Sequence, residues 1–158
     1  MELKQKKIGF ISLGCDKNKV DLEEMFNNLS SFGFKFDLPE NSDIVLINTC
    51  AFILPARKEA INNIMEMVSL KKAGKIEKII VTGCLPQRYL DELEKFIPEV
   101  DRFVQLKDNK NIVQIIASLY DVDVKFKCED KQMPLGPKHY AYLKIADGCN
   151  NACAYCTI

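Results

Sequence analysis

Three apolar runs of the sequence each end in a cysteine and are each followed by a helical pattern. The runs end at Cys15, Cys50 and Cys84, so successive cysteines are 35 and 34 residues apart. Each run has the length and β-branched content of a buried strand. After each cysteine, apolar residues recur three or four positions apart, as over residues 22–29. This alternation predicts an α/β fold with a mainly parallel sheet and helices on both faces.

Weaker signals extend the same pattern. The stretch FGFKFDL between the first two units predicts an additional strand, and DRFVQL predicts another before an apolar stripe over residues 112–119. Pro55 and Pro86 follow the second and third cysteines closely, and proline suits the first turn of a helix. We therefore expect helices to begin near both prolines.

The strand-end cysteines should meet in space. Parallel strands present their carboxyl ends at one edge of the sheet, where α/β proteins place their ligands. Helix N-termini follow, and their positive dipole ends favour thiolate over thiol. A single cysteine of this kind is more often a core residue, but burial alone does not select three strand ends. Cys15, Cys50 and Cys84 therefore predict a metal or cluster site, and Gly14 and Gly83 precede two of them, as close-approach or ordinary turn glycines.

A second cysteine group follows an alternating stretch. KHYAYLKI, beginning at Lys138, alternates as a strand should, and Cys149, Cys153 and Cys156 then lie on a loop beyond it. Structural zinc sites usually have four ligands, and only three cysteines are close together here. Cys128 could be a fourth, but it stands alone in a polar stretch and is interpreted as an incidental thiol. Three thiolates on a four-iron cluster would leave one iron open to a small molecule.

Composition weighs against some classes of function without excluding nucleic-acid binding. Lys plus Arg and Asp plus Glu number 22 each, so no basic face for a polyanion is indicated. No apolar run approaches the roughly 20 residues of a membrane span, and the start shows no signal-peptide cleavage site. We expect a cytoplasmic protein without a membrane partner. In such a reducing compartment, seven cysteines point to metal ligands or nucleophiles rather than disulfides.

The C-x-x-x-C-x-x-C spacing resembles the signature of the radical S-adenosylmethionine enzymes, and Tyr155 before the third cysteine fits it too. The resemblance implies that Cys149, Cys153 and Cys156 hold a 4Fe–4S cluster whose open iron binds S-adenosylmethionine. An electron from that cluster would cleave the cofactor to a 5′-deoxyadenosyl radical. The preceding strand resembles the first strand of that superfamily's barrel. We therefore expect the front part of a longer enzyme, inactive by itself.

The front cysteines resemble a narrower family. SLGCDKNKVDLEEM, INTCAF and VTGCLPQRYLDEL are similar to the amino-terminal domain of the methylthiotransferases, and the likeness runs from Ile8 to Ile158. It implies a second 4Fe–4S cluster on Cys15, Cys50 and Cys84, which would present the sulfur. The implied organisation is an amino-terminal methylthiotransferase domain over residues 1–125, a linker over 126–138 and the start of a radical S-adenosylmethionine domain over 139–158.

Within that family, SLGC-x-KN-x-VD resembles the branch that modifies small-subunit ribosomal protein S-twelve, although Asp16 stands where proline is common. The resemblance implies methylthiolation of an aspartate β-carbon on that protein, with an electron donor protein as a further partner. One alternative is the branch that acts on transfer RNA adenosine. A second alternative, from another class, is a non-catalytic metal- or cluster-binding module.

Overall fold

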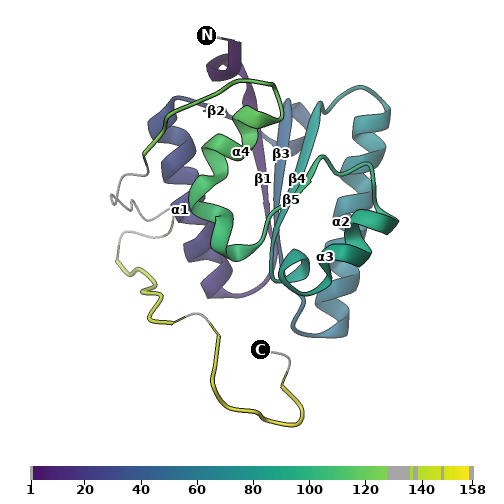
Figure 1. Cartoon of the computed structure of the whole chain (residues 1–158), viewed down its shortest axis with the longest axis vertical. Coiled ribbons are helices and arrows are strands. Elements are labelled where there is room, and N and C mark those ends of the chain that lie inside the picture. The colour runs from purple at the N-terminus through teal and green to yellow at the C-terminus, as the bar shows by residue number, and fades with distance from the viewer. Residues whose placement is uncertain (1, 128–135, 137–138, 147, 157–158) are drawn as a thin grey trace.

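The computed structural model describes residues 2–127, 136, 139–146 and 148–156, and its centre is a five-stranded sheet. The strand order is β2-β1-β3-β4-β5, and every neighbouring pair is parallel (Figure 1). The strands are β1 (Lys7–Ser12), β2 (Lys35–Phe36), β3 (Ile44–Thr49), β4 (Lys78–Gly83) and β5 (Arg102–Phe103). The predicted α/β class with a parallel sheet is confirmed.

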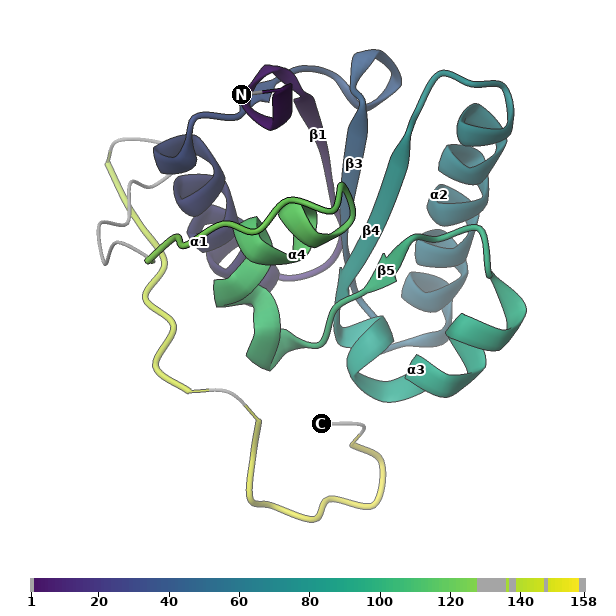
Figure 2. The ribbon, with the colours of Figure 1, turned by 45° about the horizontal axis from the view of Figure 1, so that its top comes forward.

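Helices cover both faces of this sheet, as predicted. Helices α1 and α4 lie on one face, and α2 and α3 lie on the other (Figure 2). The α-helices are α1 (Asp16–Phe32), α2 (Leu54–Lys72), α3 (Cys84–Phe96) and α4 (Ile112–Ser118), and the 3₁₀ turns are η1 (Glu2–Gln5), η2 (Pro39–Asn41) and η3 (Leu106–Asn111). Within the described part of the chain, no helix is both long and apolar enough to span a membrane.

The central strand β3 separates two cores. All six of its residues are buried, and their side chains alternate between the faces. Val45 and Ile47 join the core under α2 and α3, which includes the fully buried Ile64. Ile44 and Leu46 join the core under α1 and α4. Burial on both faces explains why the apolar run of this strand is continuous rather than alternating.

The weaker sequence signals also correspond to elements. FGFKFDL contains the short edge strand β2, and DRFVQL contains β5 at the opposite edge. Pro55 and Pro86 lie in the first turns of α2 and α3, as expected. Helix α3 begins at Cys84 itself and is kinked at Tyr89, whose φ and ψ are −129° and 34°.

The strand predicted over residues 139–146 is not formed: these described residues make no β-ladder. A strand has to share its backbone hydrogen bonds with a neighbour, and this segment instead lies beside α1. There the Lys144 ammonium is 2.6 Å from a carboxylate oxygen of Asp21, and Lys19 lies over the ring of Tyr142. Its assignment to a barrel, and the division at residues 125 and 138, stay predictions.

Candidate functional site

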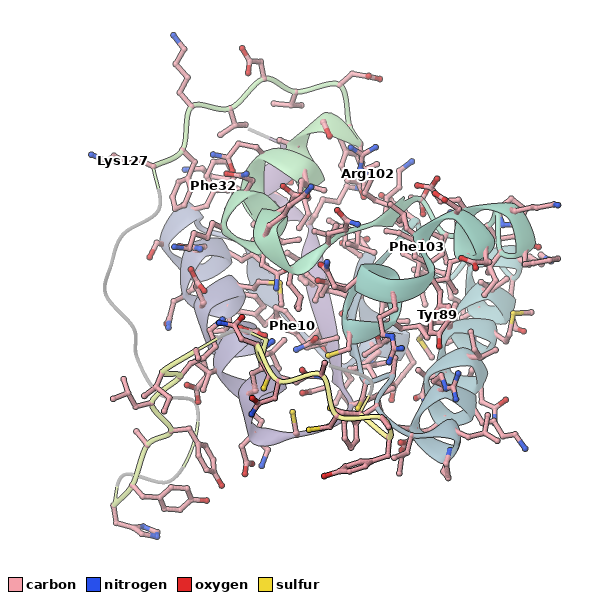
Figure 3. All side chains as sticks on the ribbon, turned by 60° about the horizontal axis from the view of Figure 1, so that its bottom comes forward. Phe10, Phe32, Tyr89, Arg102, Phe103 and Lys127 are labelled. Atoms are coloured by element: carbon pink, nitrogen blue, oxygen red, sulfur yellow. The ribbon has the colours of Figure 1, made fainter. Side chains whose placement is uncertain are left out.

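The three strand-end cysteines lie at one edge of the sheet, as predicted. Cys15 is the N-cap of α1 just beyond β1, Cys50 directly follows β3, and Cys84 directly follows β4. These three strands are neighbours in the sheet and end in register, with Ser12 opposite Asn48 and Asn48 opposite Thr82. The three cysteine loops are therefore adjacent at the lower side of Figure 1, which Figure 3 turns toward the viewer.

The prediction that helix dipoles favour thiolate at this edge is wrong for Cys84. Although Cys84 opens α3, burial raises the pKa of its thiol, and nearby Lys17 only opposes that shift. Desolvation disfavours the charged form of a group, and here its effect is larger than that of the lysine. Cys50 is buried and lies four residues before α2 begins at Leu54, so it is not at a helix terminus. Of the three front cysteines, only Cys15 and Cys84 lie at a helix terminus.

A buried asparagine joins the cysteine loops. Asn18 is fully buried, and its Oδ1 accepts weak contacts from the thiols of Cys15 and Cys84 at 4.0 Å and 3.9 Å. The two sulfur atoms are therefore no more than about 8 Å apart, as both lie near one oxygen. Sequence reasoning gave Asn18 no role. The available signal was its position on the apolar stripe of α1, in line with Leu22 and Met25.

Two glycines allow the loops to approach one another. A Cβ on Gly14 would lie 2.7 Å from the Cβ of Cys50 and 2.8 Å from Nδ2 of Asn18. A Cβ on Gly83 would lie 2.3 Å from the carbonyl oxygen of Thr49, and the φ angles are 107° and 100°. Of the two interpretations of these glycines, a close approach of the backbone fits. The atoms that approach it belong to a neighbouring loop or strand. Gly148, which precedes Cys149 in the same way, would have nothing within 4 Å of a Cβ and fits an ordinary turn glycine.

A layer of buried polar side chains supports this edge. The Thr49 hydroxyl donates to the carbonyl of Thr82 at 2.6 Å, and the Thr82 hydroxyl bonds Oδ1 of Asn109 at 2.6 Å. Nδ2 of Asn48 donates to the carbonyl of Asn18 at 2.6 Å, while its Oδ1 has no hydrogen-bond partner among the described residues. Satisfied buried polar groups fix a geometry because leaving any of them unpaired is costly. The ends of β3 and β4 are thereby held rigidly.

The second cysteine group lies on a loop, as predicted. Cys149 and Cys153 are exposed and Cys156 is half-buried. The amide of Cys156 donates to the carbonyl of Cys153 at 3.0 Å, and the amide of Asn151 points to the sulfur of Cys149 at 3.4 Å. The loop lies on the side of the molecule where the strands end (Figures 1 and 3). Their role as cluster ligands stays a prediction.

The donor geometry bears on which metal group could bind. Among the residues that the structure describes, no three His, Cys, Asp or Glu side chains converge closely enough to hold one metal ion. In a 4Fe–4S cluster each thiolate bonds its own iron, so the thiols have to surround a space rather than meet at one atom. The binding of a cluster by the front cysteines stays a prediction. Cys128, interpreted as incidental, lies outside the described residues.

Comparison with known proteins agrees with the methylthiotransferase resemblance. The chain is 48% identical over 157 residues to the ribosomal protein uS12 methylthiotransferase RimO of Sulfurihydrogenibium sp. (strain YO3AOP1), covering 99% of the chain and 35% of that relative. It is 43% identical to the protein of the same name from Caldicellulosiruptor saccharolyticus, covering 96% of the chain and 37% of the relative. The Campylobacter fetus counterpart is also 43% identical, with 94% and 34% covered.

The chain thus spans about a third of the length of the curated relatives it matches. A family comparison covers the sheet and the loops of the first three cysteines, from the start of β1 to just beyond β5. Because residues 7–105, more than half of this chain, match it, the chain belongs to the family described as "Uncharacterized protein family UPF0004".

Proposed function

We propose that the full-length protein is a radical S-adenosylmethionine methylthiotransferase that modifies the β-carbon of an aspartate in ribosomal protein uS12. One observation carries the proposal: three thiols from separate loops gather at one sheet edge, in a chain that is 48% identical to a uS12 methylthiotransferase. The transfer RNA alternative has no comparable support, because the relatives compared carry the uS12 name.

Two groups of thiols would hold two 4Fe–4S clusters. Cys15, Cys50 and Cys84 would bind one, and Cys149, Cys153 and Cys156 would bind the other together with S-adenosylmethionine. Three thiolates suit a four-iron cluster that keeps one iron free of protein ligands. When bound, these groups would supply the one-electron cleavage and the sulfur that no acid–base side chain can provide.

The chain's own residues would shape the first site. Cys50 is 9% exposed, so one side of this site is shielded from water. Lys17 acts on the Cys84 thiol in the direction that favours the thiolate, the form in which cysteine binds metal. Burial acts on the same thiol in the opposite direction and has the larger effect. The buried polar layer beneath the loops would hold the ends of β3 and β4 in place.

The remaining partners follow from the same proposal. Reductive cleavage requires an electron donor protein, and the ribosomal substrate places the enzyme in the cytoplasm. Activity is proposed for the full-length protein, which in the relatives is about three times as long as this chain, and we expect these 158 residues alone to be inactive.

The test is mass spectrometry of a strain that lacks the gene. The uS12 peptide should lose the mass of one methylthio group, while methylthiolated adenosine in transfer RNA should stay unchanged. Complementation with the full-length protein should restore the peptide, and the Cys128→Ala variant should do so equally. The opposite pattern, with a change in transfer RNA only, would refute the uS12 assignment.

Cysteine variants of the full-length protein test the division between the two groups. Cys50→Ala should abolish methylthiolation yet leave reductive cleavage of S-adenosylmethionine, since the second group is intact. Cys153→Ala should abolish both. Loss of cofactor cleavage in Cys50→Ala, with iron still bound at the second group, would contradict this division.

A further inference from the structure

Asn18 contacts the loops of all three front cysteines. Its Nδ2 donates to the carbonyl of Leu13 at 2.9 Å, just before Cys15, and to the carbonyl of Thr49 at 3.0 Å, just before Cys50. Its Oδ1 faces the thiol of Cys84 on the third loop. Asn18 is 0% exposed, so these contacts do not compete with water.

The orientation of this amide is fixed by its partners. If the side-chain amide of Asn18 were turned by 180°, its Oδ1 would face the carbonyl oxygens of Leu13 and Thr49. Three acceptor oxygens would then meet without a donor. The NH₂ group therefore faces the two carbonyls, and Oδ1 faces the thiols. The backbone of Asn18 is held as well, because its carbonyl accepts a hydrogen bond from Nδ2 of Asn48.

We propose that Asn18 is a positioning residue that draws the three loops together, so that the thiols of Cys15, Cys50 and Cys84 face one space before any cluster binds. The role of the thiols as cluster ligands rests on the proposed function, whereas the gathering of the thiols rests on the contacts alone. Gly14 supports this role, since a Cβ there would push on Asn18 and Cys50 together.

A merely structural role would have another consequence. If Asn18 only stabilised α1, its loss would lower stability without changing how readily two thiols react with one small probe. A positioning role predicts a loss of that joint reactivity at temperatures where the variant is still folded. The distinction calls for a measurement on the thiols themselves.

The probe is a trivalent arylarsenical, in which one arsenic replaces two hydroxyl groups by two cysteine sulfurs and releases two waters. The protein is the complete chain with Cys128, Cys149, Cys153 and Cys156 replaced by alanine, so that only the front thiols react. The rate at which one arsenic bridges two thiols is followed by mass spectrometry. Circular dichroism confirms folding at the temperature used.

Two variants and two controls separate the possibilities. Asn18→Asp keeps the shape but loses both N–H donors, and Asn18→Ala removes the whole amide. Asn63→Ala removes an amide that only bonds Glu59 within α2, and Ile116→Ala destabilises the core under α4. In both controls, we expect arsenic to bridge two thiols at the rate of the parent protein. In both Asn18 variants, we expect bridging to be slower by at least about ten-fold, because the second sulfur no longer attacks from a fixed position.

Anaerobic iron and sulfide loading of the same proteins separates this inference from the proposed function. A parent that binds no iron, with slow bridging in Asn18→Asp, would refute the cluster assignment and support the positioning role. Unchanged bridging in a folded Asn18→Asp protein would overturn the positioning role, whether or not iron binds.

Discussion

Replacement of Gly83 by alanine should be among the most damaging single-methyl additions to this chain. Gly83 has a φ of 100° and a ψ of −158°, a region open essentially only to glycine, so alanine there costs about 1–3 kcal/mol in strain. The new methyl would also lie 2.3 Å and 2.6 Å from the Thr49 carbonyl oxygen and amide nitrogen. Both are backbone atoms of the central strand, so overpacking adds about 1–3 kcal/mol.

The expected sum is a loss of about 2–6 kcal/mol of unfolding free energy, which is a large part of the roughly 5–15 kcal/mol of a typical domain. At about 2–4 °C per kcal/mol for a chain of this size, the melting temperature should fall by about 4–24 °C. Urea unfolding followed by circular dichroism measures the free energy, and an unchanged denaturant slope shows that only stability has altered.

Gly74 offers a matched control. Its φ is also positive, at 74°, but a Cβ there would have nothing within 4 Å. Alanine at Gly74 should therefore cost only the backbone term of about 1–2 kcal/mol, partly offset by the lower entropy of the unfolded chain. If Gly83→Ala destabilised the protein no more than Gly74→Ala, the steric argument at the strand end would be refuted.

Three further outcomes are expected. Ile64→Ala, in the fully buried core under α2, should lower the unfolding free energy by about 2–5 kcal/mol in urea titration. Burial, followed by the hydrogen bond to Glu77, raises the pKa of Tyr120. The unfolded chain therefore loses this proton first, so stability should fall above about pH 10, by less than about 1.4 kcal/mol per pH unit, and Tyr120→Phe should remove that slope. Lys144→Met should speed proteolysis within residues 139–146, because it removes the ion pair with Asp21. The unfolding free energy should change by less than about 1 kcal/mol, since the Asp21 carboxylate regains water when the segment leaves. An unchanged cleavage rate would contradict the contact.

The sheet and the place of the front cysteines could be predicted because both follow from short-range pattern. Continuous apolar runs such as that of β3 indicate a strand buried on both faces, and parallel strands have to end at one edge. The role of Asn18 could not be predicted in the same way. An asparagine next to a helix start is usually interpreted locally, whereas Asn18 bonds the carbonyl of Thr49, 31 residues away.

The two errors have separate physical causes. The thiolate preference expected at Cys84 considered only the helix terminus, whereas burial, which depends on tertiary packing, raises the pKa of this thiol. The strand expected over residues 139–146 considered only side-chain alternation. Alternation says which faces a strand would present, but a strand forms only where a neighbouring strand accepts its hydrogen bonds.

Helix α1 connects the segments that carry the two cysteine groups. From its buried side, Asn18 reaches the loops of the front cysteines. From its flank, the carboxylates of Asp16 and Asp21 hold the segment that leads to the second group. Hydrogen bonds to Asp16, first from Lys19 and then from the Tyr142 hydroxyl, keep the pKa of its carboxyl below the usual range.

Asp16 stands where proline is common in the branch that this chain resembles, and the contact with Tyr142 gives that departure a physical use. Proline would also suit the first turn of α1, but it has no carboxylate to accept a hydrogen bond from Tyr142. Of the contacts described here between α1 and residues 139–146, the Lys144–Asp21 ion pair and the position of Lys19 over the ring of Tyr142 would then remain. Asn18 and Asp21 lie one helix turn apart, so α1 contacts both the loops of the front cysteines and the segment that precedes the second group.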